Sequence, residues 1–298
     1  MALAAWHEGR RRSLAFRETS DPYSVLVAET MAQQTQVGRV DPAWRAFLAR
    51  FPTPARLAAA SPGDVLRAWA GLGYNRRAVH LWRAAREIVE QHGGSVPTDR
   101  EALEALPGVG PYTSRAVSAV CFGIAVAPLD TNIRRLVGRL LAGYGRPGDP
   151  GTPIPPFELQ RVADSLVDRA APAEWVHAAM DLGAAVCRAR PSCPGCPLRR
   201  SCVYPRLLAE NGAVAGRVAG GTAARTRSAR PFAATRRWLR GRIVERLRDA
   251  PDGAWLVLEG PIGGHEERAV GEAVEGLARD GLLERDRRGR VRLPTSAG

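Results

Sequence analysis

The sequence contains no lysine, so all 43 of its basic residues are arginines. A lysine amine is the usual nucleophile of Schiff-base catalysis, and its absence excludes that chemistry through lysine. The chain also lacks an apolar run long enough to cross a bilayer and a charged-then-apolar N-terminal segment of the signal-peptide type. From these absences we expect a cytoplasmic protein that does not use a membrane as a partner.

Positive charge exceeds negative charge, with a net formal charge of +13 and an isoelectric point near 10.8. Such an excess predicts a polyanionic partner, although a generally arginine-rich proteome would produce the same composition. Arginine forks pair well with phosphates. At 298 residues, 45% of them hydrophobic, the chain is long enough for two or three domains.

Helix signals fill the first two-thirds of the chain. Three pairs, Asp21-Pro22, Asp41-Pro42 and Ser61-Pro62, each place a capping side chain before a proline, which is typical of a helix start. Apolar residues then recur at helical spacing, and no alternating strand pattern occurs before residue 205. We therefore predict an all-α fold for this part.

The composition changes after residue 205. Residues 206–230 are rich in Ala, Gly, Arg and Thr, which predicts a mobile basic linker. A small unit follows over 231–298, with helices predicted at 233–249 and 265–280 and a hairpin at Leu282–Leu293 that turns at Arg287-Arg288-Gly289. This order indicates a winged-helix-like domain, and a generic helical cap is the alternative.

The segment Leu106-Pro-Gly-Val-Gly110, followed by Pro111-Tyr112, predicts a tight turn between two helices. Gly108, Val109 and Gly110 leave the backbone N–H groups of the turn open, and the next helix adds its N-terminus. Together these groups predict a phosphate site. A plain helix–helix turn is the alternative.

Four of the five cysteines, Cys187, Cys193, Cys196 and Cys202, follow the spacing C-x5-C-x2-C-x5-C. Clustered cysteines in a cytoplasmic protein indicate a metal centre rather than disulfides. The spacing by itself leaves a [4Fe–4S] cluster and a tetrahedral zinc both open. Cys121 stands apart in an apolar segment, where we expect a buried small hydrophobe.

Two carboxylates are candidates for acid–base chemistry. Glu29 lies two turns into a predicted helix beside Val27 and Met31, where partial burial would suit a proton donor. Asp130 precedes a helix predicted to begin near Thr131, so its alternative role is an N-cap.

Five motifs occur together in one order, and they resemble the MutY family of adenine glycosylases in the helix-hairpin-helix, Gly-Pro-Asp superfamily. They are Glu29-Thr-Met-Ala-Gln-Gln-Thr-Gln, Gly71-Leu-Gly-Tyr74, the 106–112 hairpin, Leu129-Asp-Thr-Asn-Ile-Arg-Arg, and Met180-Asp-Leu-Gly183 before the cysteines. The resemblance covers residues 10–205. It implies an all-α, two-lobed glycosylase core over 1–205, with a six-helix barrel near 21–130. An iron–sulfur lobe would combine 1–20 with 131–205.

The resemblance also implies roles for individual residues. Glu29 matches the general acid that protonates adenine at N7, and Asp130 matches the carboxylate that stabilises the oxocarbenium-like sugar. Tyr112 and Asn132 match two supporting residues of the catalytic site. The residues implied at the DNA are Gln34 and Tyr74, which wedge into the duplex, with Leu72, Gly108, Val109, Gly110 and Arg17. The cysteines match the ligands of a [4Fe–4S] cluster.

The implied function is hydrolysis of the N-glycosidic bond of adenine mispaired with 8-oxoguanine or guanine. The partner would be double-stranded DNA bound by a monomer at the nucleoid, in a cleft where Glu29 and Asp130 face each other. Endonuclease III is a similar family that places a lysine at the position of Tyr112, so the lysine-free chain predicts a monofunctional enzyme. The alternatives are a thymine or uracil mismatch glycosylase, an endonuclease III-like lyase, and a non-enzymatic iron–sulfur DNA-binding regulator.

Three departures from the family pattern stand out. The first cysteine spacing is x5 where the family usually has x6, and Leu14-Ala-Phe-Arg17 replaces Leu-Pro-Trp-Arg. A Gln or Glu expected near the adenine pocket is His177 here, unless His177 is a surface histidine. The chain shows no Nudix-like domain after residue 205, which leaves recognition of 8-oxoguanine without its usual domain.

Overall fold

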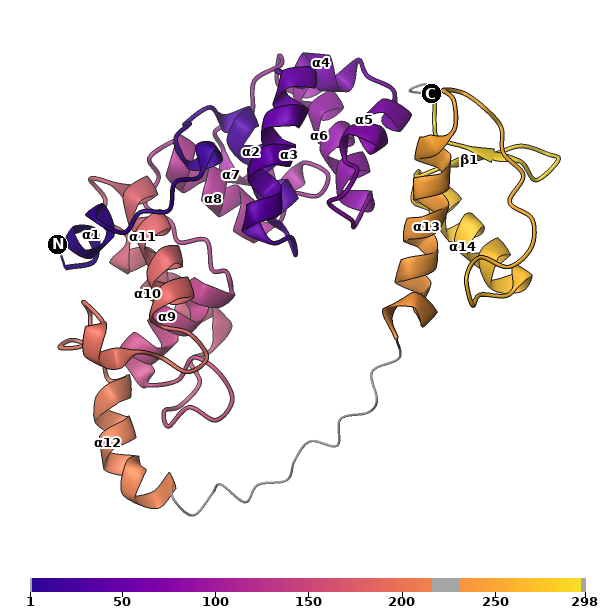
Figure 1. The fold of residues 1–298 in the computed structure, drawn as a ribbon. Helices are drawn as coiled ribbons and strands as arrows, with labels where there is room; N and C mark the ends of the chain where they lie inside the picture. Colours follow the sequence, from indigo (N-terminus) through magenta and orange to yellow (C-terminus); the bar gives the residue numbers. More distant parts are fainter. Residues whose placement is uncertain (1, 216–230, 296–298) are drawn as a thin grey trace. The chain divides into compact units, whose positions relative to one another are not determined.

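The structure of the protein is a computed structural model that describes residues 2–215 and 231–295 (Figure 1). The chain forms two compact units. The first combines residues 1–25 with 109–225, and the second combines 26–108 with 226–298. Helices dominate both units, as predicted, and within the described ranges the two short strands both follow residue 205. None of the helices described is long and apolar enough to span a membrane.

The first unit joins the two ends of the glycosylase-like region. Its elements are α1 (Ala2–Glu8), η1 (Ala15–Arg17), α8 (Pro111–Cys121), α9 (Thr131–Ala142), α10 (Pro156–Leu166), α11 (Pro172–Ala185), η2 (Cys193–Gly195) and α12 (Tyr204–Ala215). The helix α11 packs against α1, α8 and α9, so it forms the centre of this unit. The core includes Ile133 and Val137 of α9, Leu159 of α10 and Leu182 of α11, all buried.

The second unit begins inside α2 (Pro22–Ala32). The elements that follow are α3 (Val37–Arg50), α4 (Pro54–Ala58), α5 (Pro62–Ala68), α6 (Arg76–Gln91), α7 (Arg100–Ala105), η3 (Phe232–Ala234), α13 (Arg236–Asp249), α14 (Glu267–Arg279), β1 (Glu284–Arg285) and β2 (Val291–Arg292). The long helix α6 packs against α4 and α5. Seven of its residues are buried, because apolar side chains recur along one face of the helix.

An aromatic cluster forms part of the core of the second unit. The ring of Phe47 lies edge-on to Phe51 and Trp69, with centroid distances of 5.0 and 5.9 Å. Edge-to-face pairs of this kind stabilise a core beyond the area they bury. The indole N–H of Trp69 donates to the carbonyl of Gly73 at 3.2 Å. The buried tryptophan therefore holds the loop that carries Tyr74.

Residues 231–295 contain the predicted elements of the C-terminal part. The helices α13 and α14 pack against each other, and β1 pairs with β2 in an antiparallel hairpin that turns at Gly289, where φ is 80°. The helix bounds lie within three residues of those expected at 233–249 and 265–280. The assignment of this part to the winged-helix class remains a prediction.

Two sequence-based boundaries were wrong. Pro42 lies inside α3, which begins five residues earlier at Val37, and Asp41 pairs with Arg45 at 3.2 Å. Burial of Val40, Trp44 and Phe47 on one face stabilises the longer helix despite the proline. The predicted linker at 206–230 begins with helix, because α12 extends to Ala215. The rest of that linker, 216–230, lies outside the described residues.

The two units also differ in extent from the predicted lobes. The helix α8 and the segment to residue 130 belong with the first unit, although the barrel was expected to run to about 130. The reason is that α8 packs on α11. Sequence order alone does not reveal that contact, since the two helices are separated by more than 50 residues.

We predict that Phe47→Ala destabilises the protein by about 3–5 kcal/mol, the usual cost of removing a fully buried phenylalanine. Phe47 is 0% exposed, whereas Phe157 is 82% exposed. Phe157→Ala is therefore the matched control and should change the free energy of unfolding by less than about 0.5 kcal/mol. Urea denaturation of both variants checks this. Equal effects of the two substitutions would contradict the core described here.

Candidate functional site

Asp130 is the N-cap of α9, and both of its carboxylate oxygens accept hydrogen bonds. The backbone N–H of Ile133 donates to Oδ1 at 2.7 Å, and the side-chain amide of Asn132 donates to Oδ2 at 2.8 Å. The capping role considered for this residue is therefore present. The hydrogen bond from Asn132 brings these two candidate site residues together. A carboxylate held at both oxygens has a defined orientation.

Asn132 connects this carboxylate to the cysteine segment through Arg135. The Arg135 guanidinium donates to Asn132 Oδ1 at 2.9 Å, to the carbonyl of Gly183 at 2.7 Å and to the carbonyl of Cys187 at 2.6 Å. A Cβ at Gly183 would lie 2.7 Å from Asn132 Cβ, so only glycine fits the close approach of α11 to α9. This explains why the Met180–Gly183 motif ends in glycine.

Tyr112 and the glycine turn lie at the start of α8. Tyr112 is half-buried in the first turn of that helix, with Pro111 at its first position and Gly110 as N-cap. Gly108 has φ of +81°, and a Cβ there would lie 2.7 Å from His80 Cβ. Val109 is buried at 6% exposure, so its side chain anchors the turn. The turn therefore has the open backbone and following helix that phosphate binding requires.

The four clustered cysteines line one small cavity that is otherwise mostly apolar. Burial raises the pKa of Cys193 and Cys196, and it raises the pKa of Cys202 to about 11. These thiols are therefore neutral unless a cationic group binds them. Among the described residues, no three side chains of the types that ligate metals come close enough to hold a metal ion. Cys121 is half-buried at the end of α8, not fully buried as expected.

Arg139 supports the cysteine segment from α9. Its side chain is 1% exposed and forms an ion pair with Asp149 at 2.7 Å. The guanidinium donates to the carbonyls of Arg188 at 2.6 Å and Ala189 at 3.2 Å, and it lies 3.8 Å from Cys187 Sγ. Arg139 and Arg135 thus hold the backbone at the first cysteine from two sides.

Glu29 lies on α2 in the second unit. It is half-buried, and its neighbours Ala28 and Thr30 are 2% and 5% exposed. The hydroxyl of Thr30 donates to the carbonyl of Leu26 at 2.8 Å, so the helix satisfies this polar neighbour internally. Glu29 therefore borders a buried face of the helix. The pairing of Glu29 with Asp130 remains a prediction.

Gln34 and Tyr74 share an unusual backbone conformation. Their φ angles are 55° and 46°, and they are the two non-glycine residues with positive φ among those described. This left-handed conformation costs roughly 1–3 kcal/mol for such residues and concentrates at functional sites. Gln34 is exposed and Tyr74 is 36% exposed. Both predicted wedge residues are thus presented at the tips of strained loops.

One arginine holds both loops. The Nη1 atom of Arg77 lies 2.8, 2.9 and 2.7 Å from the carbonyl oxygens of Thr30, Met31 and Gln33. Its Nη2 atom donates to the carbonyls of Leu72 and Gly73 at 3.2 and 3.1 Å. Burial lowers the pKa of Arg77 to about 10, and the group stays charged at neutral pH. The strain at the loop tips is therefore offset by charge-assisted hydrogen bonds at their bases.

Two residues predicted at the DNA are buried in the structure. The Leu72 side chain is 6% exposed and packs inside its loop. Arg17 is buried and donates to both oxygens of Asp181 at 3.0 Å, together with His7 at 3.0 Å. Although burial by itself raises the pKa of Asp181, these partners hold it below its usual value. A guanidinium in such a pair is unavailable to phosphate, so we correct Arg17 to a structural residue.

His177 is next to this buried ion cluster. It is 8% exposed, so it is not a surface histidine. Burial lowers the pKa of His177 to about 3, and the positive charges of Arg17 and Arg11 add to the effect. The imidazole is therefore neutral across the physiological range.

Sequence reasoning missed Arg77, Arg135 and Arg139. Each lies inside or just after a recognised motif, so its position in the sequence could have identified it. Its residue type could not, because arginines on helices are mostly exposed. Their acceptors are backbone carbonyls of distant loops, and these have no signature in the sequence.

The chain is similar to known DNA repair proteins. The model of the HhH-GPD superfamily of base excision DNA repair proteins matches residues 27–150. The adenine DNA glycosylase of Mycobacterium tuberculosis strain H37Rv is 38% identical over 306 residues, which cover 98% of this chain and 92% of the relative. The match therefore includes the C-terminal part.

Two solved structures have a similar fold. A thermostable thymine-DNA glycosylase superposes with a TM-score of 0.63 and 28% identity over 69% of this chain and 94% of the other. A trapped endonuclease III–DNA covalent intermediate gives a TM-score of 0.57 and 24% identity over 68% and 92% of the two chains. The second similarity concerns the fold alone.

We predict that His177 makes the protein less stable as the pH falls from about 6.5 toward 4. An unfolded histidine takes up a proton near pH 6.5, whereas folded His177 does so only near pH 3. The unfolded state then binds more protons, so stability falls by up to about 1.4 kcal/mol per pH unit. Urea midpoints measured between pH 4 and 7 for the wild type and for His177→Gln check this. A variant with an equally steep pH dependence would contradict it.

Proposed function

This chain belongs to the adenine DNA glycosylase family within the HhH-GPD superfamily of base excision DNA repair proteins. We propose that it hydrolyses the N-glycosidic bond of adenine mispaired with 8-oxoguanine or guanine in double-stranded DNA. The observation that carries the proposal is the match to an adenine DNA glycosylase over 98% of this chain. The lysine-free, arginine-rich composition is consistent with a DNA-binding hydrolase.

Two carboxylates divide the chemistry in this proposal. Glu29 donates a proton to adenine at N7, which makes the base a better leaving group. Asp130 stabilises the positive charge that develops on the sugar, since its oxygens are held by Asn132 and the helix backbone. Water then completes the hydrolysis. Tyr112, at the start of α8, has a supporting role beside the reacting carbon.

The adenine leaves the base stack before either group acts, at a cost of a few kcal/mol. Gln34 and Tyr74 replace part of the lost stacking by entering the space that the base vacates. Their exposure on loops held by Arg77 supports this role, because an inserted side chain must resist displacement. The protein acts as a monomer on chromosomal DNA in this proposal.

Strand cleavage through a Schiff base is not part of the proposal. The residue at the start of α8 is Tyr112, and no lysine exists elsewhere in the chain. We therefore expect an abasic site as the product, with the strand intact until alkali is added.

We also propose that the four clustered cysteines hold a [4Fe–4S] cluster. Each iron of such a cluster takes one thiolate, whereas a zinc ion draws all four sulfurs to about 2.3 Å from one centre. The four cysteines line one shared cavity, and the resemblance to the adenine glycosylase family favours the cluster. When bound, the cluster supplies a rigid anchor for residues 187–202, whose Arg199 and Arg200 are exposed toward solvent.

A thymine mismatch glycosylase is the second candidate. The similarity to a thymine-DNA glycosylase structure at 28% identity favours it. The two candidates differ in the base that is released, which an assay on defined duplexes resolves.

We predict that Glu29→Gln and Asp130→Asn each slow adenine release by about 100-fold or more, the usual range for losing an acid–base group. The measurement is single-turnover base release from A·8-oxoguanine, A·G and T·G duplexes. Asparagine is also a good N-cap, so Asp130→Asn should leave α9 intact.

Asp99→Asn is the matched control, because Asp99 caps α7 in the same way by accepting from Ala102 N at 2.9 Å. It should release adenine at the wild-type rate. Release of thymine from T·G with none of adenine would overturn the proposed substrate. Unchanged rates for both catalytic-site variants would overturn the mechanism.

We predict about four irons per chain in the purified protein, with a brown colour, and loss of both in Cys193→Ser. Cys121→Ser is the control and should keep its iron, because Cys121 does not line the cysteine cavity. Metal and sulfide analysis of the two variants checks this. One zinc per chain without iron would contradict the cluster.

A further inference from the structure

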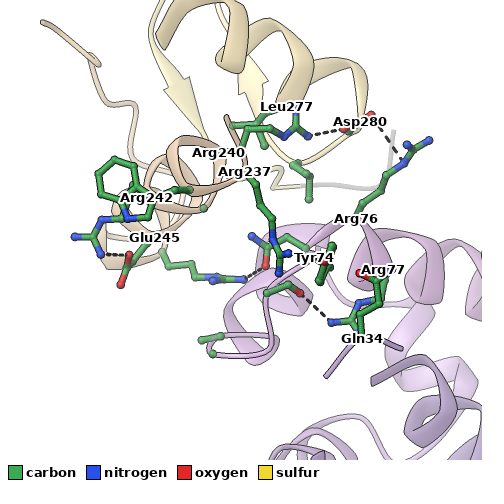
Figure 2. Close-up of a pocket in the computed structure, with 18 of the residues that line it drawn as sticks. Gln34, Tyr74, Arg76, Arg77, Arg237, Arg240, Arg242, Glu245, Leu277 and Asp280 are labelled. Atoms are coloured by element: carbon green, nitrogen blue, oxygen red, sulfur yellow. Dashed lines mark hydrogen bonds and ion pairs between the residues drawn. The ribbon is translucent and has the colours of Figure 1, made fainter. Parts of the chain in front are cut away.

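The second unit contains a groove of about 1190 Å³ lined by eight arginines and three carboxylates (Figure 2). One wall is formed by the loops of Gln34 and Tyr74 and by the start of α6. The other wall is α13. Both predicted wedge residues therefore lie in a strongly positive groove, and five of its eight arginines come from the C-terminal part of the chain.

Specific contacts fix α13 and its neighbours on the loops. Arg248 of α13 donates to the carbonyl of Leu66 and to the side chain of Asn75, both at 2.8 Å. The N–H of Gly63 donates to the carbonyl of Pro294 at 2.8 Å. A Cβ at Gly63 would lie 2.7 Å from that oxygen, so the contact requires glycine. These contacts hold the two walls of the groove together.

Arg237 joins the groove directly to a wedge residue. Its guanidinium lies 3.8 Å from the centre of the Tyr74 ring, and Nη1 donates to the Tyr74 hydroxyl at 2.5 Å (Figure 2). A cation over an aromatic face at this distance is an attractive contact. The C-terminal part therefore contacts Tyr74 directly, in addition to Arg77, whose guanidinium lies 5.6 Å from the centre of the same ring.

Two further arginines of α13, Arg236 and Arg242, have weaker partners. Arg242 pairs with Glu245 at 2.5 Å, but both side chains are 50% exposed, and such pairs contribute little. Arg236 donates to the carbonyl of Glu272 at 3.3 Å. Neither Arg236 nor Arg242 joins α13 to the loops as Arg248 does.

Aromatic side chains alternate with the arginines. Phe232 and Trp238 line the groove beside Tyr74, and Phe232 is 61% exposed. Exposed aromatic rings among arginines are typical of surfaces that follow a nucleic acid strand. An acidic protein partner would explain the positive charge of the groove, but it would not explain the exposed aromatic rings.

We propose that this groove binds the phosphodiester backbone of DNA, with Arg236 and Arg242 of α13 contacting phosphates next to the point where Gln34 and Tyr74 enter the duplex. The C-terminal part is then a second DNA-binding element that shares a surface with the wedge. The inference rests on the proposed function, since it takes DNA as the partner of the wedge residues.

The test is the salt dependence of DNA affinity in the full-length protein. Each phosphate contact contributes about 0.9 to the slope of log K against log salt concentration. The double variant R236A/R242A should therefore lower that slope by about 1.8 on a duplex, measured by fluorescence anisotropy.

The matched control is R268A/R279A, which removes the same charge from exposed positions of α14 outside the groove. Arg268 also has an acidic neighbour on its own helix, Glu272, at 4.0 Å. The control should keep the wild-type slope. Equal slopes for the two double variants would overturn the proposal. The proposal would also be overturned if R236A/R242A kept its affinity for DNA and lost affinity only for polyglutamate, a probe for an acidic protein partner. If the wild type released no adenine, the proposed function would fail, while the slopes would still report on the groove.

Discussion

The guanidinium of Arg77 donates to backbone carbonyls of two loops that are about 40 residues apart in sequence. Those loops present Gln34 and Tyr74 in left-handed conformations that few side chains adopt. Without the hydrogen bonds from this buried cation to the loop carbonyls, both loops would relax toward less strained backbone angles. The presentation of these two predicted wedge residues therefore depends on one desolvated charge.

In the first unit, buried or half-buried arginines also donate hydrogen bonds to backbone carbonyls of a distant segment. Arg135 and Arg139 donate to the carbonyls of Cys187, Arg188 and Ala189, and Arg135 also contacts Asn132, which in turn holds Asp130. A carboxylate proposed to stabilise charge on the sugar is thus two hydrogen-bonded residues away from the cysteine segment. Arginine suits this work because its planar fork reaches several acceptors at once, whereas lysine presents a single point charge. The absence of lysine therefore coincides with extensive structural use of arginine.

Positive charge has three separate uses in this molecule. Arg17, Arg77, Arg139 and Arg248 are buried or half-buried and organise the fold. Arg237 stacks on Tyr74. Arginines at the groove surface, such as Arg242, remain exposed. The net charge of +13 is the sum of these groups, so the total by itself says little about how much of it is available to DNA.

Local patterns predicted much of the fold and of the candidate site. Helix starts at Asp21-Pro22 and Ser61-Pro62 were correct because a cap needs only the next three residues. The prediction at Asp41-Pro42 was wrong because burial of one face of α3 outweighed the cap signal. Arg17 was assigned to DNA by resemblance, yet its partner Asp181 is 164 residues away.

The sequence by itself determined the helical class, the glycine turn, the clustering of the cysteines and the exclusion of lysine chemistry, because each of these depends on residue type and short spacing. Only the tertiary structure decided which arginines are buried, which loops they join, and that α13 lines a groove with Tyr74. Those features depend on contacts between segments far apart in the chain. The free energy of such contacts comes from burial and hydrogen-bond geometry, which no short stretch of sequence contains.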